Sequence, residues 1–358
     1  MQVGTTRMQV GTTRMQVVHI PSHGDPSVLR IVDLPVPEPG PGEVLVRILG
    51  TSVNHLDLWS RRGMPGVKLP LPLIPGCDGT GEIVALGAGV SGPRVGTKVL
   101  VEPGSSSGKS AHDLAGNDHL SDDYQIRGEH YDGLAAEYVA VEARYVLPLP
   151  EGVDPVRAAA APLVFLTAWG MLVSRAQVQP GESVLVLAGT SGVGSAAIQI
   201  AKDRGCRVVA TAGSESKRAL CLELGADAVV DHADSNWPSL AKKAAGGKSF
   251  DVVVEHVGPA TWEGSMRVLA RNGRLVTCGA TTGPSVSIAL PHLFIKNQSV
   301  LGSTMGPRRA FPEILAKIAS GAYRPVVDRV MPMSQVRLAH ELLESRQVQG
   351  KIVLVPGS

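Results

Sequence analysis

The stretch Ser183-Val-Leu-Val-Leu-Ala-Gly-Thr-Ser-Gly-Val-Gly-Ser-Ala-Ala-Ile-Gln-Ile-Ala-Lys-Asp203 decides the fold. Its first part, 184–188, is a short apolar run, which is typical of a parallel strand buried on both faces. Three glycines follow, and residues 196–201 are predicted to form a helix. A glycine-rich turn between strand and helix lets the backbone approach a pyrophosphate, whose charge the helix N-terminus favours. The predicted cofactor contacts in this turn are Gly189, Thr190, Ser191, Gly192, Val193 and Gly194.

The spacing of these glycines is Gly-x-x-Gly-x-Gly instead of the usual Gly-x-Gly-x-x-Gly, so the turn alone is a weak signal. Its context is stronger, because a second apolar strand, 207–211, arrives after one helix length. The alternative, a glycine turn in an α/β domain that binds no nucleotide, is less favoured by this context. Further strands are predicted at 228–230, 252–255, 274–277 and 300–303. Together they predict a doubly wound, six-stranded parallel sheet with right-handed crossovers.

Composition and charge limit the kinds of partner. The 358 residues are enough for two domains with full cores. The 34 Lys and Arg against 32 Asp and Glu give a net charge of +2, which favours neither nucleic acid nor a membrane surface. The four cysteines form no Cys-x-x-Cys pair, which fits reduced thiols in a cytosol. The most apolar window, 158–173, is too short to cross a bilayer, so we expect a cytoplasmic protein.

The chain divides into four predicted segments. Residues 1–14 repeat one heptapeptide twice and cannot bury a core, so they are interpreted as an N-terminal extension. Residues 15–152 predict a β-rich, partly closed barrel with a polar surface lobe at 103–131. Its strands are predicted at 44–49, 82–86, 98–101 and 137–141. After a proline-rich hinge, residues 153–310 form the predicted nucleotide domain, and residues 311–358 are expected to return to the first domain.

Motifs from Met15 to the C-terminus resemble those of the medium-chain dehydrogenase/reductase superfamily. They are Pro37-x-Pro39-Gly40-x-Gly42-Glu43-Val44, Asn54-His55-x-Asp57, Pro75-Gly76-Cys77-Asp78-Gly79-x-Gly81, the glycine turn and the tail Gly350-Lys351-Ile352-Val353-Leu354. The resemblance implies an α/β protein in which a GroES-like catalytic domain precedes a Rossmann dinucleotide-binding domain. It also implies an oxidoreductase that uses NAD or NADP.

The residues that would bind catalytic zinc are mostly missing. In zinc-dependent alcohol dehydrogenases of this superfamily, a Cys ligand stands at the position of Asn54, and a His ligand and a Glu stand at the positions of Cys77 and Asp78. The third ligand, a Cys, has no counterpart in residues 161–167. Catalytic zinc needs three protein ligands and an open position, so we expect no catalytic zinc.

The predicted lobe lacks the second zinc site as well. Zinc-binding relatives carry four cysteines there, and the same register in this chain reads Ser107, Ser110, Asp113 and Ser121. Serine hydroxyls are poor zinc ligands at neutral pH. Three histidines lie in or near the lobe, and we interpret them as solvated surface residues and not as metal ligands: His112, His119 and His130.

The Asn54-His55-x-Asp57 motif supplies the two predicted catalytic-site residues. Asn54 is expected beside the nicotinamide, where its amide would hold a substrate carbonyl or the cofactor ribose; helix capping is an equal alternative. Asp57 is expected to support the site structurally and not to act as an acid. We also expect Asp78 in a polar network and Cys77 as a small buried thiol.

The resemblance implies further cofactor contacts. His55 would contact the pyrophosphate, with a lone surface histidine as the alternative, and Thr167 would pack against the nicotinamide. Lys351 matches a cationic residue near the pyrophosphate, although an ordinary exposed lysine fits the tail nearly as well. Val257 and Gly279 complete the predicted set.

The end of the second strand favours NADPH. NAD-binding proteins place an Asp or Glu about 20 residues beyond the first glycine, and the corresponding residues 209–214 contain no carboxylate. Ser214, Lys217 and Arg218 instead offer a hydroxyl and two cations that suit a 2′-phosphate. Glu215 leaves NADH open, because a shift of one residue would bring its carboxylate to the ribose.

These features resemble the zinc-free, quinone oxidoreductase-like branch, which implies hydride transfer from NADPH to a quinone, an enone or a related conjugated carbonyl. A zinc-type alcohol or aldehyde dehydrogenase is the first alternative, and a non-catalytic NADPH-binding sensor or partner-binding protein is the second. The expected partners are a small-molecule substrate and a second copy of the chain. Strand 300–303 would be an open sheet edge, which predicts at least a homodimer and allows a tetramer.

Overall fold

The computed structural model describes residues 13–64, 66 and 68–357. Most of the predicted N-terminal extension therefore lies outside the described residues. Arg14, its last residue, already belongs to strand β1 (Arg14–His19), which pairs antiparallel with β2 (Arg30–Pro35). Strand β1 thus begins one residue before the predicted boundary between the extension and the first domain.

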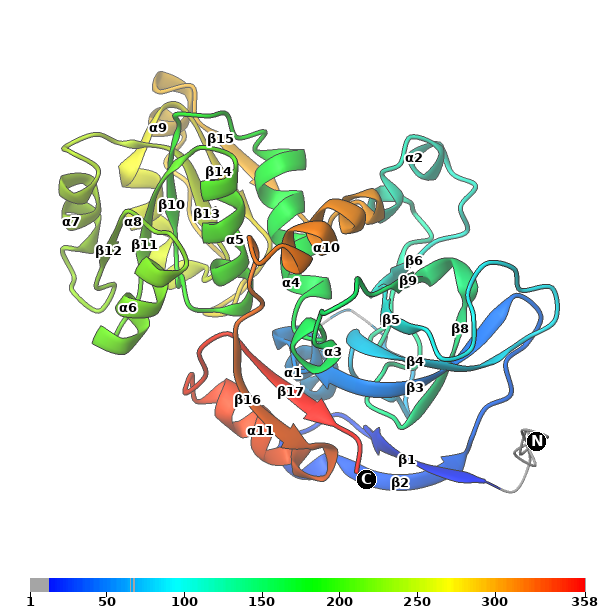
Figure 1. Cartoon of the computed structure of the whole chain (residues 1–358). Helices are drawn as coiled ribbons and strands as arrows, with labels where there is room; N and C mark the ends of the chain where they lie inside the picture. Colours follow the sequence, from blue (N-terminus) through cyan, green and yellow to red (C-terminus); the bar gives the residue numbers. More distant parts are fainter. Residues whose placement is uncertain (1–12, 65, 67, 358) are drawn as a thin grey trace.

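A six-stranded sheet forms the nucleotide domain, in the order β12-β11-β10-β13-β14-β15, and every pairing in it is parallel. This confirms the predicted doubly wound α/β fold, with helices on both faces of the sheet (Figure 1). The strands are β10 (Ser183–Val186), β11 (Arg207–Thr211), β12 (Ala228–Val230), β13 (Phe250–Glu255), β14 (Leu269–Thr277) and β15 (Ser299–Gly302). The helices are α5 (Gly192–Asp203), α6 (Glu215–Glu223), α7 (Trp237–Ala244), α8 (Pro259–Val268) and α9 (Leu290–Ile295).

The central strand β10 shows why its sequence is apolar without alternation. Val184 and Val186 belong to one buried cluster, on the side of α5, whereas Leu185 belongs to a second cluster with Trp237 and Trp262. A strand covered on both faces buries every side chain, so no polar residue interrupts it. The order of the strands reverses between β10 and β13, and ligands of such sheets bind at the carboxyl ends beside this point.

A seven-stranded, mainly antiparallel sheet forms the catalytic domain, in the order β16-β17-β3-β4-β5-β9, with β8 also paired to β3. The C-terminal strands β16 (Val327–Pro332) and β17 (Lys351–Val355) belong to this sheet, because β17 pairs with β3. The other members are β3 (Glu43–Ser52), β4 (Asp78–Leu86), β5 (Lys98–Val101), β8 (Tyr138–Glu142) and β9 (Val146–Pro148). Helices α1 (His55–Arg62) and α11 (Val336–Glu344) complete this domain, whereas α10 (Phe311–Ala319) packs in the same buried cluster as α5 of the nucleotide domain.

Short helical segments join the two domains. They are α3 (Pro155–Ala158), α4 (Pro162–Trp169) and η4 (Gly170–Arg175), and α4 lies between the domains in Figure 1. This is the most apolar part of the sequence, and it is buried in the protein core. Nowhere in the described part of the chain is there a helix with the length and apolar character that crossing a bilayer requires.

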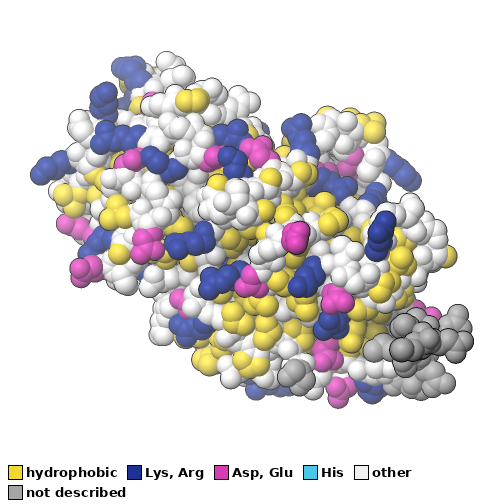
Figure 2. Space-filling view, viewed as in Figure 1, with side chains coloured by type: hydrophobic (Ala, Val, Ile, Leu, Met, Phe, Trp, Pro, Cys, Tyr) yellow, Lys and Arg dark blue, Asp and Glu magenta, His cyan; other side chains and the backbone are white. Residues whose placement is uncertain are grey.

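The polar lobe contains little regular structure. Its elements are β6 (Gly104–Ser105), α2 (Ala111–Leu114), η2 (Asp118–Leu120) and β7 (Gln125–Ile126). On the face seen in Figure 2, Lys and Arg side chains alternate with Asp and Glu, and no broad area of one charge is visible. This mixed surface agrees with the near-neutral net charge.

Candidate active site

The glycine turn connects β10 to α5 and forms a concave backbone surface. Side chains at its glycine positions would collide with neighbouring atoms. A Cβ on Gly194 would come within 2.4 Å of the Ala188 carbonyl oxygen, and one on Gly192 within 2.7 Å of Val164. Ser191 caps α5, because its Oγ accepts a hydrogen bond from the Gly194 N–H at 2.9 Å. The turn therefore presents backbone N–H groups and a helix N-terminus, which fit the pyrophosphate of a dinucleotide.

The C-terminal tail closes directly on this turn. The Gly350 N–H donates to the Thr190 carbonyl oxygen at 2.7 Å. Lys351, the next residue, starts β17, and its aliphatic stem lies where a side chain on Gly192 would be, 3.0 Å from the ideal Cβ. The catalytic domain thus brings one lysine to the edge of the predicted cofactor site.

Lys351 is buried in a polar cluster together with Asp78 and Asn54. Its Nζ lies 3.0 Å from Asp78 Oδ2 and also donates to Asn54 Oδ1. Asn54 Nδ2 donates to the same carboxylate oxygen at 2.9 Å. Asp78, Lys351 and Asn54 are 0%, 4% and 5% exposed, so the exposed lysine considered from the sequence is wrong. Asn54 stands at the start of α1, but its amide group is directed into this cluster.

One hydroxyl group and one backbone N–H also donate hydrogen bonds to Asp78. Ser52 Oγ donates to Oδ2 at 2.9 Å, and the Leu163 N–H donates to Oδ1 at 2.6 Å. Leu163 lies in the segment where zinc enzymes of the family carry their third ligand. The carboxylate is therefore saturated by hydrogen bonds, and this matches the network role predicted for Asp78.

Asp57 binds backbone on both sides of the site. Its carboxylate accepts from the Asn54 N–H at 2.7 Å and from the Gly76 N–H at 2.9 Å. Burial raises the pKa of Asp57 to about 6, against the opposing effect of these hydrogen bonds. The side chain connects the start of α1 to the loop before β4 and does not face solvent, as a structural role requires.

The other predicted cofactor residues lie around the same cleft. Burial, with smaller contributions from His256 and Lys351, lowers the pKa of His55 to about 4, so this side chain is neutral at pH 7. Thr167 is buried on α4. Val257 and Gly279 follow β13 and β14 at the carboxyl end of the sheet. The individual roles of these residues stay predictions.

Cations gather just after the end of β11. Ser214 caps α6, Arg218 pairs with Asp231 at 2.9 Å, and Lys217 Nζ donates to the Arg346 carbonyl oxygen at 3.0 Å. Burial lowers the pKa of His232; the charge of Asp231 opposes this shift, and the charges of Lys217 and Arg346 add to it. Arg346, on the loop after α11, thus adds a positive charge that the sequence analysis missed.

A cavity of about 720 Å³ opens at the carboxyl ends of β13, β14 and β15. Gly279 and Gly302 line it from the sheet, and Trp59 and His119 line it from the catalytic domain. Phe294 is 66% exposed and does not line this cavity.

Comparisons with known proteins agree with this architecture. Residues 40–151 match a model of the alcohol dehydrogenase GroES-like domain, and residues 192–320 match one of a zinc-binding dehydrogenase. A quinone oxidoreductase of Rattus norvegicus is 31% identical over 340 residues, which cover 93% of this chain and 95% of that protein. The chain belongs to the medium-chain dehydrogenase/reductase superfamily.

Two solved structures of this superfamily also resemble the chain. The crystal structure of an NAD-dependent alcohol dehydrogenase superimposes with a TM-score of 0.93 and 45% identity, over 96% of this chain and 100% of that one. A crotonyl-CoA carboxylase/reductase in complex with NADP gives a TM-score of 0.86 and 26% identity, over 98% and 96%. The chain is therefore an NAD(P)-dependent oxidoreductase. The comparisons do not decide between NAD and NADP, and they do not identify the substrate.

Catalytic zinc does not fit the residues at the superfamily's usual position. Burial raises the pKa of the Cys77 thiol well above its ordinary value, so it carries no thiolate charge. Asp78 and Asn54 are occupied by the ammonium group of Lys351. A cation already stands among the candidate ligands, and no cluster of three or more His, Cys, Asp or Glu suited to a metal occurs in residues 13–64, 66 and 68–357.

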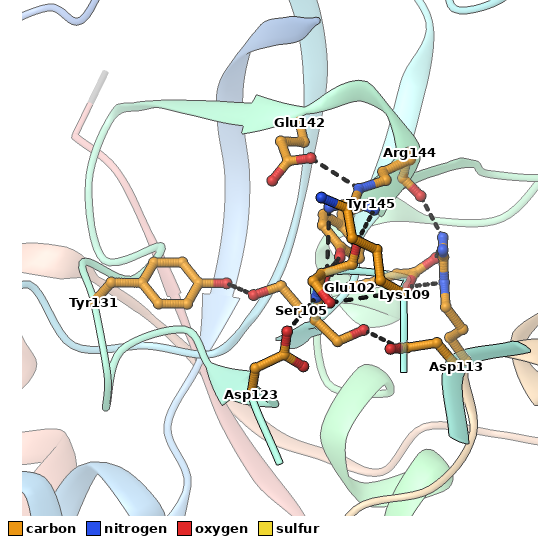
Figure 3. A network of polar contacts seen from close by, with 12 residues as sticks. Glu102, Ser105, Lys109, Asp113, Asp123, Tyr131, Glu142, Arg144 and Tyr145 are labelled. Atoms are coloured by element: carbon orange, nitrogen blue, oxygen red, sulfur yellow. Dashed lines mark hydrogen bonds and ion pairs between the residues drawn. The ribbon is translucent and has the colours of Figure 1, made fainter. Parts of the chain in front are cut away.

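The lobe replaces the four cysteines of its zinc-binding relatives with hydrogen bonds, and Figure 3 shows this part of the molecule. Asp113 accepts from Ser106 Oγ at 2.5 Å, from Ser110 Oγ at 2.7 Å and from Ser121 Oγ at 3.2 Å. These donors lower the pKa of Asp113 to about 2. The carboxylate and hydroxyls therefore satisfy one another's hydrogen bonds at positions where zinc-binding relatives carry cysteines.

One lobe residue was wrongly predicted. His119 is 6% exposed and not a solvated surface residue, whereas His112 and His130 are exposed as expected. The reason is a contact between distant segments. Arg308, near the end of the nucleotide domain, binds Glu102 at 2.9 Å, and its backbone N–H donates to Asp118, the neighbour of His119. This packing covers the histidine.

Elemental analysis of the purified protein is expected to find no stoichiometric zinc. The reason is the donor set, since a protonated thiol and a lysine-bound carboxylate hold zinc poorly. Oxidoreductase activity should also survive prolonged incubation with a chelator. One or two zinc atoms in each chain, or loss of activity that zinc restores, would contradict this prediction.

Proposed function

We propose that this protein transfers hydride from NADPH to a quinone, an enone or a related conjugated carbonyl, without zinc. The observation that carries the proposal is the Asn54–Asp78–Lys351 cluster. It places a buried ammonium group where zinc-dependent members of the superfamily hold their metal. The similarity to a quinone oxidoreductase supports the same reaction class.

NADPH supplies the hydride, and the protein supplies its binding and orientation. The glycine turn would hold the pyrophosphate, and Thr167 and Gly279 would flank the nicotinamide. Hydride transfer to the electrophilic carbon leaves a negative charge on the carbonyl oxygen, which then takes a proton from solvent. A preorganised donor near this oxygen lowers the barrier most where water is excluded.

Lys351 is the donor that we assign to this oxygen. An ammonium group has three N–H bonds, and Asp78 and Asn54 accept two of them. The third N–H bond is used by neither residue and would donate a hydrogen bond to the substrate oxygen. Asp78 and Asn54 would thereby act as positioning residues, because their hydrogen bonds fix the rotamer of the lysine.

A dehydrogenase of simple alcohols is the second candidate, and the 45% identity to an NAD-dependent alcohol dehydrogenase favours it. A panel of quinones, enones, aldehydes and alcohols, each assayed with both cofactors, distinguishes the two. NADPH oxidation with quinones or enones supports the proposal. Turnover confined to alcohols and aldehydes would overturn it, and no turnover at all would favour a non-catalytic NADPH-binding protein.

Lys217→Ala is expected to raise the KM for NADPH about ten-fold and to leave the KM for NADH nearly unchanged. A charged hydrogen bond to the 2′-phosphate contributes roughly 1.5–3 kcal/mol, and NADH has no such phosphate. Steady-state kinetics with both cofactors measures this. Lys248→Ala, a lysine outside all the predicted contacts, is the control. Equal effects on both cofactors would show that Lys217 does not read the phosphate.

The edge strand β15 supports a homodimer. It is the last strand of the sheet, and the segment before it exposes apolar side chains at Val286, Leu290 and Phe294. Light scattering at micromolar concentration should give at least twice the 37.4 kDa of one chain. Val300→Pro removes a ladder donor at this edge and is expected to favour monomers. A wild-type mass near that of one chain would contradict the prediction.

A further inference from the structure

The cavity beside β13, β14 and β15 has one cationic end. Its sheet side is lined by small residues, among them Gly279, Gly302 and Ser303, and Trp59 and Trp262 add aromatic surface. Arg175 lines it where η4 ends. Among the described residues, no Asp or Glu side chain lines the cavity.

The Arg175 side chain is exposed, and its guanidinium group is not neutralised by a carboxylate of the described residues. Its Nε donates to the Gly302 carbonyl oxygen at 2.8 Å, which ties the side chain to the end of β15. Within residues 13–64, 66 and 68–357, no carboxylate lies within salt-bridge distance of it. A planar guanidinium with unpaired N–H groups is suited to bind a carboxylate through two parallel hydrogen bonds.

His119 lies at the same end of the cavity and has an unsatisfied ring nitrogen. The side chain is 6% exposed, and its Nδ1 has no hydrogen-bond partner among the described residues. Burial, and then the charges of Arg309 and Arg175, lower the pKa of His119 to about 4, so the ring is neutral at pH 7. Buried polar atoms in folded proteins are nearly always paired, so His119, which lines the cavity, has hydrogen-bonding capacity that the described chain does not use.

The acidic groups nearest to this end are already paired elsewhere. Glu102 and Asp118 both face Arg308, which donates to Glu102 through its guanidinium and to Asp118 through its backbone N–H. Arg309, by contrast, binds only the neutral amide oxygen of Asn117 among the described groups. The field at His119 is therefore positive, and the unpaired cation on the cavity wall is Arg175.

We propose that Arg175 and His119 form a subsite for a carboxylate on the substrate, so that the preferred substrates are conjugated carbonyl compounds bearing a negative charge. The proposal rests on the proposed function, since it names the substrate class for that reaction. The nicotinamide side of the cavity would hold the reacting carbon, and the cationic end would bind the carboxylate. The pair thus selects and orients the substrate and takes no part in proton or hydride transfer.

The test compares two enones that differ in charge, 4-oxopent-2-enoate and its methyl ester. Each is assayed with NADPH and wild-type enzyme, with Arg175→Gln and with His119→Phe. For the carboxylate, kcat/KM is expected to fall about ten-fold or more in Arg175→Gln and by a smaller factor in His119→Phe. For the ester, both variants should stay within about two-fold of wild type. His119→Asn, which restores a polar group near Nδ1, should recover part of the loss.

Three results would overturn the proposal. The first is an equal loss on both enones, which would show a structural role. The second is no loss on either enone. The third is a matching rise in the KM for NADPH, which would assign the cations to the cofactor. Arg267→Gln, which removes an exposed arginine paired only within its own helix, is the matched control.

Binding separates a failure of the subsite from a failure of the proposed reaction. If neither enone is reduced, calorimetry with the NADPH-bound protein and 4-oxopentanoate, the unreactive saturated acid, still reports on the subsite. Binding to wild type that weakens at least ten-fold in Arg175→Gln, and is absent for the methyl ester, supports the subsite even without turnover. Equal binding of acid and ester, or no binding of the acid, rejects it.

Discussion

Lys351→Met is expected to lower both the stability and the turnover of the protein. The substitution keeps an apolar stem of similar length but leaves Asp78, which is fully buried, without its ammonium partner. Breaking a buried ion pair on one side typically costs roughly 3–5 kcal/mol, because the remaining charge is uncompensated. The free energy of unfolding, measured by denaturant titration, should fall by about this amount.

Turnover should fall for a separate reason, which a second variant isolates. Loss of a preorganised donor to a developing oxyanion lowers kcat by about 100-fold or more. The double variant Asp78→Asn/Lys351→Met removes the stranded charge, so we expect most of the stability to return while kcat stays low. If the double variant recovers both stability and kcat, Lys351 has only a structural role. If Lys351→Met alone is as active as wild type, Lys351 takes no part in the mechanism.

Gly194→Ala is expected to weaken binding of NADPH by roughly ten- to a hundred-fold. The new methyl group would lie 2.4 Å from the Ala188 carbonyl oxygen. That oxygen belongs to the backbone and cannot move away as a side chain can, so the turn must open. Overpacking of this kind costs roughly 1–3 kcal/mol, and the distortion falls on the N–H groups that face the pyrophosphate.

Fluorescence titration of the protein with NADPH measures this effect directly. Gly357→Ala is the control, because a Cβ there meets no atom within 4 Å. Denaturant titration of Gly194→Ala should show a loss of stability no larger than roughly 1–3 kcal/mol if the damage is confined to the turn. An unchanged dissociation constant for NADPH would show that the cofactor does not use this cradle.

The sheet of the nucleotide domain could be predicted because each strand carries its own signal. The run 184–188 and the glycines after it are local features, and burial on both faces explains the absence of polar residues. The tail Lys351–Val355 was likewise found from its apolar pattern, and the structure places it with the same bounds. Such features need no knowledge of distant contacts.

The burial of Lys351 and of His119 could not be predicted, because it depends on segments far apart in sequence. Lys351 is buried because β17 pairs with β3, which sets Val353 opposite Ser52 and brings the ammonium to Asp78. His119 is buried because Arg308 binds the lobe across a separation of about 200 residues. No local sequence pattern around Lys351 or Arg308 predicts these contacts. In the sequence, the only sign of further positive charge near the cofactor site is a cation close to the tail, such as Arg346.

Two of the contacts described above connect the domains on different sides of the cleft. At one, the Gly350 N–H meets the Thr190 carbonyl oxygen; at the other, Arg308 meets Glu102. The first contact involves the backbone of the glycine turn itself, so a movement of one domain that preserves it leaves that turn nearly in place. The hydrogen bonds from the Leu163 N–H to Asp78 and from Lys217 to the Arg346 carbonyl oxygen join the same two parts of the chain beside it. A bound dinucleotide would therefore meet a pyrophosphate cradle whose position relative to the catalytic domain is already set.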